Sequence, residues 1–291
     1  SNNLKKMKYQ IVKNFFVCFS SEREDPGNKK FKLFDITKVF SGHSEQCSKI
    51  FKKFYGSVFK KIHNAKTLEI AEMSKLLENI YRSVNIGLVN EMKKICTKMN
   101  IDIFEVINAA ATKNFGFKVF WPGPGMGGHC IPIDPFYLTW KAKEFGAKSR
   151  FIELAAEINS EMPVWIFKRV QEILNKKNIN ISQSKVLILG VSYKKNIDDV
   201  RGSPAIKLID IMLKNNAKVF FNDNYVKELN IQHKNFSSRS LNYKKCNLKK
   251  FDLVILVTDH DYYEKNFLIN NSKIIFDARF YLNNNKKVFR C

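Results

Sequence analysis

A chain of 291 residues is long enough to bury a large core, and its length predicts about two domains. Hydrophobic residues make up 45% of it, yet no apolar run reaches the roughly 18 residues of a membrane-spanning helix. The first residues are basic and lack the apolar stretch of a signal peptide. The composition therefore predicts a globular, cytoplasmic protein without a membrane partner.

The formal net charge of +23 brings nucleic-acid-binding proteins into consideration. Only 8 of the 50 basic residues are arginine, whereas proteins that bind bases and phosphates favour arginine forks. The lysines are spread along the whole chain, and the charge suits an anionic small ligand equally well. No nucleic-acid partner is predicted. The six cysteines form no C-x-x-C pair, so no metal site is predicted either.

The N-terminal part of the chain alternates short strand and helix patterns. We expect strands at 15–20, 37–42 and 57–62 and a helix at 45–56. Apolar residues then recur at helical spacing through 67–100, which predicts one long helix. Because its apolar stripe is broad, this helix is expected to form the core of a homodimer.

Shorter helices follow, and then a sheet pattern begins. Ser160 and Pro163 are expected to restart a helix, as its N-cap and first-turn residues. After residue 178 apolar runs alternate with an amphipathic segment, which predicts a Rossmann-like parallel sheet. The predicted helices are 102–113, 136–146, 150–177 and 203–216, and the predicted strands are 185–190, 218–223, 252–258 and 273–278.

The segment FWPGPGMGGHCIPIDPF, residues 120–136, is the most unusual of the chain. It holds four of the twelve glycines and four of the seven prolines. Glycine lets backbone approach a ligand closely, and proline fixes the path of the loop. Asp134 stands four residues after Cys130, so both side chains can face one site. Local chemistry leaves two interpretations open, a nucleophilic cysteine in a ligand-binding loop or an incidental buried cysteine in a tight connection.

This segment resembles the cysteine loop of the UDP-glucose/GDP-mannose dehydrogenase family. The letters GGHC followed by IPIDP are most similar to the branch that acts on UDP-N-acetylhexosamines. Other stretches resemble the family in the same order, over about residues 15 to 280. They are FSSEREDPGN (19–28), AEMSKLLENIYRSVNIGLVNE (71–91), FIELAAEINSEMP (151–163) and LILGVSYKKNIDDVRGSP (187–204).

The resemblance implies an enzyme that oxidises C6 of a UDP-sugar to a carboxylate with two NAD+. An aldehyde can lose a hydride only after a nucleophile has added, so Cys130 is expected to form a thiohemiacetal and then a thioester that water hydrolyses. By resemblance, Lys75 and Asn79 stabilise negative charge on the substrate oxygen. Asp134 and Glu22 match carboxylates that assist proton and water chemistry. Without the resemblance, the face with Lys75 and Asn79 would be interpreted as a solvated helix face.

Nucleotide recognition is implied for a second group of residues. Lys194 and Arg279 match family cations that contact the UDP-sugar, and Gly127 and Gly128 lie in the substrate loop. Arg201 matches an arginine that reaches towards NAD. Taken alone, each of the three cations would be interpreted as an ordinary surface charge.

Two residues depart from the family pattern. Ser21 stands where proline is usual, just before Glu22, and Gly202 stands where glutamate is usual. The first departure weakens the expectation for Glu22, and the second puts the local loop geometry in doubt.

The predicted fold is α/β in three parts. They are a C-terminal remnant of an NAD-binding Rossmann-like domain (1–64), a central all-helical dimerisation region with the cysteine loop (65–180), and a C-terminal Rossmann-like domain that binds the UDP-sugar (181–291). The family implies a strand, a G-x-G-x-x-G turn and a helix upstream, and residues 1–64 contain no such unit.

The chain by itself is therefore expected to be inactive. The first expected substrate is UDP-N-acetylglucosamine and the second is UDP-N-acetylmannosamine, oxidised for the synthesis of surface polysaccharide precursors. Two alternatives remain, a truncated remnant that only binds nucleotide sugar and a basic protein associated with nucleic acid.

Overall fold

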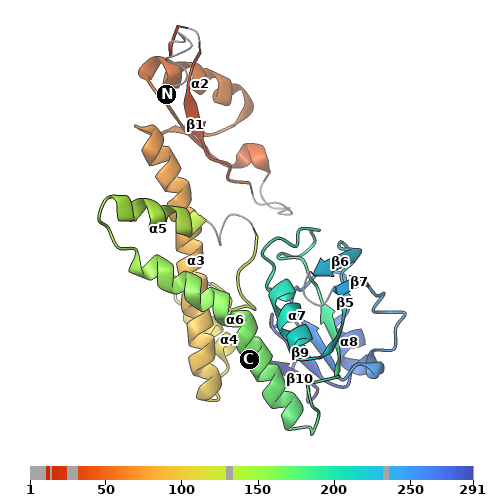
Figure 1. Ribbon diagram of the computed structural model, residues 1–291. Helices are drawn as coiled ribbons and strands as arrows, with labels where there is room; N and C mark the ends of the chain where they lie inside the picture. Colours follow the sequence, from red (N-terminus) through yellow and green to blue (C-terminus); the bar gives the residue numbers. More distant parts are fainter. Residues whose placement is uncertain (1–10, 14, 25–31, 129–133, 232–235, 291) are drawn as a thin grey trace. The chain divides into compact units, whose positions relative to one another are not determined.

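The computed structural model describes residues 11–13, 15–24, 32–128, 134–231 and 236–290. The chain divides into two compact units, Ser1–Asn79 and Ile80–Cys291. Figure 1 shows the elements of both units in chain order.

The first unit contains a three-stranded sheet. Its strands are β1 (Cys18–Ser20), β2 (Lys38–Gly42) and β3 (Ile62–Asn64), with β2 in the middle, antiparallel to β1 and parallel to β3. The turn η1 (Leu33–Asp35) precedes β2, and α2 (Glu45–Val58) connects β2 with β3. The Ser44 hydroxyl caps α2 by accepting the N–H of Cys47.

The strand predicted at 57–62 was wrong, because helix α2 continues through Val58 and β3 begins only at Ile62. The Tyr55 ring packs between Phe51 and Phe59, 6.0 Å and 6.1 Å away between ring centroids. This aromatic packing at helical spacing favours another helical turn over an extended segment.

The predicted long helix is confirmed as α3 (Leu68–Lys98), which begins in the first unit and continues in the second. In the second unit it is followed by α4 (Ile103–Ala111), α5 (Asp134–Glu144) and α6 (Arg150–Asn175). α6 packs closely on α3, since a Cβ on Gly87 would lie only 3.2 Å from the Cβ of Ala155.

Helix α6 runs without interruption through Pro163, so the predicted restart at Ser160 and Pro163 was wrong. A proline inside a helix cannot bond the carbonyl four residues earlier, here that of Asn159. That carbonyl lies beside the glycine-rich loop, 3.1 Å from where a Cβ on Gly125 would be. Met162 and Ile166 on the same turns are completely buried, and this packing holds the helix together across the missing bond.

The predicted parallel sheet is confirmed in the second unit. Its five parallel strands follow the order β10-β9-β8-β4-β5. They are β4 (Lys185–Leu189), β5 (Lys218–Asn222), β8 (Leu253–Leu256), β9 (Ile275–Asp277) and β10 (Val288–Arg290). Helix α7 (Pro204–Lys214) connects β4 to β5, and α8 (Lys265–Asn271) connects β8 to β9. A hairpin of β6 (Glu228–Ile231) and β7 (Phe236–Arg239) and the turn η3 (Leu248–Lys250) lie between β5 and β8.

The side chains of this sheet alternate between two buried cores. Val186 and Ile188 of β4 face a core shared with α6 and α7, whereas Leu187 and Leu189 face a second core that includes Leu268 of α8. Ligands of open α/β sheets bind at the carboxyl ends of the strands. A binding site is therefore expected at the loops after β4, β5, β8 and β9. Among the described residues, no helix has both the length and the apolar character that crossing a membrane requires.

Candidate functional site

Two buried asparagines hold the start of the glycine-rich loop. The Asn90 amide oxygen on α3 accepts the N–H of Gly123 at 2.9 Å, and its NH2 group donates to the Asn159 side chain on α6 at 2.9 Å. Asn159 in turn donates to the Ser83 carbonyl at 3.0 Å. Each amide is thus satisfied away from water, and the chain of bonds fixes the loop against both helices.

The end of the same loop packs against the loop that follows β4. A Cβ on Gly127 would lie 2.6 Å from the Cβ of Tyr193, and the Gly128 N–H donates to the Arg201 carbonyl at 2.9 Å. Gly202 has a φ of 62°, and a Cβ there would lie 3.0 Å from the Gly128 oxygen. Glycine at 202 therefore fits this geometry, in which two backbone segments approach each other without side chains.

Arg279 lies beside the start of the glycine-rich loop. It follows β9, and its Nε donates to the Val257 carbonyl at 2.8 Å, with Asp259 at 3.8 Å. A Cβ on Gly123 would lie 2.9 Å from its guanidinium nitrogen. The guanidinium thus lies directly beside loop backbone.

The structure therefore brings one group of predicted residues together at the carboxyl ends of β4 and β9. Gly127 and Gly128 contact the segment that carries Lys194 and Arg201, and Arg279 contacts the same loop. Lys194 is half-buried, next to Tyr193. Arg201 is more exposed, and Asp199 holds it in a two-pronged ion pair with contacts of 3.0 Å and 2.6 Å.

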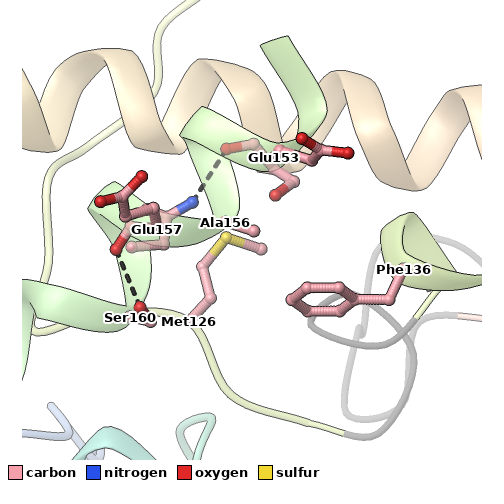
Figure 2. A pocket seen from close by; sticks show the side chains of 8 residues that line it. Met126, Phe136, Glu153, Ala156, Glu157 and Ser160 are labelled. Atoms are coloured by element: carbon pink, nitrogen blue, oxygen red, sulfur yellow. Dashed lines mark hydrogen bonds between the residues drawn. The ribbon is translucent and has the colours of Figure 1, made fainter. Parts of the chain in front are cut away.

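Cys130 lies outside the described residues, so its predicted role stays a prediction. Asp134, the first residue of α5, is half-buried. A cavity of about 360 Å³ lies between helices α3, α5 and α6 and the glycine-rich loop. Figure 2 shows Met126 and the ring of Phe136 reaching into it beside α6. Its lining consists of Ser83, Met126, Phe136, Glu153, Ala156, Glu157, Asn159 and Ser160.

A second group of predicted residues lies in the first unit. Glu22 follows β1 and accepts a bond from Lys38 at 3.2 Å. Its neighbour Arg23 holds Glu78 on α3 through two bonds of 3.3 Å and 2.6 Å. Glu78 precedes Asn79 on the same helix, so this ion pair brings the segment with Glu22 to the stretch of α3 with Lys75 and Asn79.

These residues differ in their exposure to water. More than half of the Glu22 side chain is exposed. The buried part raises the pKa of its carboxyl group, but hydrogen bonds from backbone N–H groups and from Lys38 outweigh this effect, so that the pKa lies below the ordinary value. Asn79 is buried and Lys75 half-buried, so a fully solvated helix face is not what the structure shows.

Two further pairs were missed in the sequence. The Arg23–Glu78 ion pair joins segments too far apart in the chain to be recognised as partners. Asn159, however, shares the α6 face of buried Ala155 and Met162, and a polar residue in an apolar stripe is a detectable sign of a buried amide.

The C-terminal sheet does not fit a dinucleotide in the usual way. A Cβ on Gly190, which follows β4, would lie 2.4 Å from the Thr258 oxygen, and the segment after Gly190, VSYKK, lacks the further glycines of a dinucleotide fingerprint. Asp223 follows β5, where a ribose-binding carboxylate would stand, but it is buried and bonded within the protein. The described residues of this sheet therefore provide no cradle for NAD.

The glycines at 123, 125 and 128 have the spacing G-x-G-x-x-G, but they are not a nucleotide fingerprint. Residues 113–128 contain neither helix nor strand, whereas that motif requires a strand before it and a helix after it. In the part of the chain that the structure describes, no three His, Cys, Asp or Glu side chains converge to hold a metal ion.

Comparisons with known proteins agree with this arrangement. Residues 69–161 match the central domain of the UDP-glucose/GDP-mannose dehydrogenase family, and residues 187–284 match its UDP-binding domain. Protein CapL of Staphylococcus aureus is 35% identical over 280 residues, which are 94% of this chain and 65% of the relative. UDP-N-acetyl-D-glucosamine 6-dehydrogenase of Salmonella typhi is 36% identical over 214 residues, 73% of this chain and 50% of the relative.

Solved structures show the same fold. UDP-N-acetyl-D-mannosamine dehydrogenase of Pyrococcus horikoshii superposes with a TM-score of 0.83 at 29% identity, over 99% of this chain and 66% of that one. The chain thus spans about two thirds or less of these relatives. The two matched domains together cover most of the sequence, and the chain belongs to the UDP-glucose/GDP-mannose dehydrogenase family.

Proposed function

We propose that this chain is the central and UDP-binding part of an enzyme that oxidises a UDP-N-acetylhexosamine at C6 to the uronic acid. One observation carries the proposal: the glycine-rich loop that leads to Cys130 packs directly on the segment with Lys194 and Arg201 and on Arg279. A reactive thiol and cations for a diphosphate would then share one site.

The substrate would lie with its diphosphate near Lys194 and Arg279. A diphosphate carries two negative charges, and charge-assisted bonds from a half-buried lysine and a guanidinium hold it firmly. UDP-N-acetylglucosamine is the first candidate and UDP-N-acetylmannosamine the second, since relatives with both names align with this chain. The product would serve the synthesis of surface polysaccharide precursors in the cytoplasm.

The chemistry at C6 would depend on Cys130. Its thiolate adds to the aldehyde carbon, and loss of a hydride from the resulting thiohemiacetal leaves a thioester. Water then attacks the thioester carbon, which releases the carboxylate and restores the thiol. Lys75 and Asn79 would stabilise the substrate oxyanion. Asp134 and Glu22 would accept and return protons, and Glu22 is ionised near neutral pH.

The family normally uses NAD, which accepts the hydrides of such oxidations. In this chain only Arg201 is proposed to contact it, and the described residues do not define the rest of that site. Binding of UDP-sugar is therefore the part of the function that this chain can show directly.

Replacing Lys194 or Arg279 by alanine tests the binding part. Each change should weaken the binding of UDP-N-acetylglucosamine by about 1.5–3 kcal/mol, because one charge-assisted contact is lost. Isothermal titration calorimetry measures the effect. Lys218→Ala is the matched control, because Lys218 starts β5 at the opposite edge of the sheet. Equal affinity of parent, Lys194→Ala and Arg279→Ala would remove both cations from the site.

Cys130→Ser tests the covalent part, in a protein that includes an NAD-binding domain. Acid formation should stop while the fold survives, since a serine hydroxyl is a much poorer nucleophile near neutral pH. Production of the uronic acid is measured by mass spectrometry. Unchanged production by the variant would refute the assignment of Cys130.

A further inference from the structure

A completely buried histidine lies at the carboxyl edge of the C-terminal sheet. His260 follows β8, and its side chain is 0% exposed. Its Nε2 atom is 2.9 Å from the Asp223 carboxylate and 3.2 Å from the Ser192 hydroxyl. Its Nδ1 atom accepts the backbone N–H of Asn196 at 2.9 Å. One imidazole thus joins the segments after β4, β5 and β8.

These contacts define the protonation state of the ring. A backbone N–H is always a donor, so Nδ1 must be unprotonated and the proton of the neutral ring lies on Nε2, facing Asp223. A second proton, on Nδ1, would oppose the Asn196 N–H, donor against donor. Because the ring is excluded from water, this conflict can be relieved only by movement of the backbone at Asn196.

The segment joined in this way carries Lys194. The Thr258 hydroxyl donates to the Ser192 carbonyl at 2.6 Å, and the Ser192 hydroxyl donates to the Lys194 carbonyl at 2.9 Å. Lys195 and Asn196 both bond Asp261, at 3.0 Å and 2.6 Å. Residues 190–199 are therefore held by residues 257–261, with His260 at the centre.

Three tyrosine rings lie near the imidazole. Tyr225, Tyr262 and Tyr263 lie 5.2 Å, 5.2 Å and 5.8 Å from it between ring centroids, and burial raises the pKa of Tyr262 and Tyr263. The Asp223 carboxylate contacts the ring, and Asp261, the residue after His260, bonds Lys195 and Asn196.

We propose that His260 is a positioning residue that holds the Lys194 segment only as a neutral imidazole, so that a second proton on His260 weakens the binding of a UDP-sugar. The ligand rests on the proposed function. The coupling of His260 to the Lys194 segment does not, since it follows from hydrogen bonds within the chain. A change in the charge of this ring should therefore change the affinity of this site for the ligand.

The affinity for UDP-N-acetylglucosamine tests this by calorimetry on the 291-residue chain between about pH 5 and pH 8. Its diphosphate is esterified at both ends, so the ligand itself does not titrate in this range. We expect affinity to be about tenfold weaker at the acidic end, the effect of one lost hydrogen bond. In His260→Gln, whose amide both donates and accepts but does not titrate, affinity should not change with pH. His63→Gln, at an exposed position in the first unit, should keep the parent's dependence.

Hydrogen exchange of the Asn196 amide gives a second readout that needs neither ligand nor variant. Corrected for intrinsic exchange, protection should fall on acidification as the bond to Nδ1 breaks. The same protection at both ends of the pH range would overturn the proposal, as would a parent-like pH dependence of binding in His260→Gln. Absence of UDP-N-acetylglucosamine binding at every pH would instead refute the proposed function, and Asn196 exchange would still decide the role of His260.

Discussion

Hydrogen bonds within the protein occupy both oxygens of the Asp223 carboxylate. One carboxylate oxygen accepts the N–H groups of Val191 and Ser192 and the Nε2–H of His260, and the other accepts the N–H of Tyr225. Burial by itself raises the pKa of Asp223, but the bonds from His260 and the backbone outweigh burial and lower it below the ordinary value.

We therefore expect Asp223→Asn to lower the free energy of unfolding by about 1.5–3 kcal/mol at neutral pH, because charge-assisted bonds become weaker. The folded pKa lies below the unfolded one, so the ionised group adds stability above the unfolded pKa and loses it as pH falls through the folded pKa. The parent should thus lose its advantage over the variant as pH falls from the unfolded pKa through the folded pKa of Asp223. Urea unfolding at several pH values measures both effects.

Asp210→Asn serves as the matched control, since Asp210 forms an i,i+4 surface pair with Lys214. It should change stability by less than about 1 kcal/mol. If the difference between parent and Asp223→Asn stayed constant down to acid pH, the lowered pKa would not be the source of the stabilisation.

Among single residues, the family motif predicted residues of the site. Residues that become partners only in the folded chain were missed. The family motif pointed to Arg279 and Gly127, and in the structure Arg279 lies beside Gly123 of the loop that contains Gly127. Asn90 and Asn159 could not be paired in advance, because 69 residues separate them and only the packing of α3 on α6 makes them neighbours. Asp223 ends one predicted strand and His260 follows another, so their meeting at one edge could have been inferred from parallel strand direction.

Among the elements, helix α3 carries a row of exposed apolar side chains. Leu88, Met92, Ile95 and Met99 follow one another at spacings of three and four residues and are between 36% and 61% exposed. Such a row lies along one face of a helix. It agrees with the expectation that this helix forms the core of a homodimer, which remains a prediction.

The chain should therefore sediment as a dimer at micromolar concentration. Leu88→Glu combined with Ile95→Glu should shift it to monomer, because each apolar side chain removed from an interface costs about 1.5–3 kcal/mol and the new charges repel across the two-fold axis. Lys98→Glu, at an exposed position on the same helix, should leave the dimer intact. A parent that sediments as a monomer would contradict the prediction.

Long periodic elements were predictable, and their interruptions were not. The spacing of apolar residues defined α3 to within two residues at each end. Pro163 was expected to begin a helix and lies inside one, because burial of the turns on both sides outweighs the local preference of proline. Tertiary packing of this kind cannot be predicted from a short stretch of sequence.

For the whole molecule, we expect no reduction of NAD+ by the 291-residue chain alone. The turn after β4 lacks the glycine fingerprint that would hold a pyrophosphate, and Asp223 is bonded within the protein. Purified chain, UDP-N-acetylglucosamine and NAD+ are incubated together, and the absorbance of the reduced cofactor is followed. Sustained turnover that Cys130→Ser abolishes would show that NAD binds elsewhere in this chain.

Pro163 and Gly125 restrict each other's replacement. Any residue with an N–H at position 163 would reclaim the Asn159 carbonyl for the helix. A Cβ at position 125 would lie 3.1 Å from that carbonyl, and the φ of 125° there also disfavours a side chain. The two positions therefore form a mutational pair, although they belong to a helix and a loop. Replacing the proline to stiffen α6 would also alter the anchorage of the loop, so an engineered gain in helix stability would be made at the expense of the site it supports.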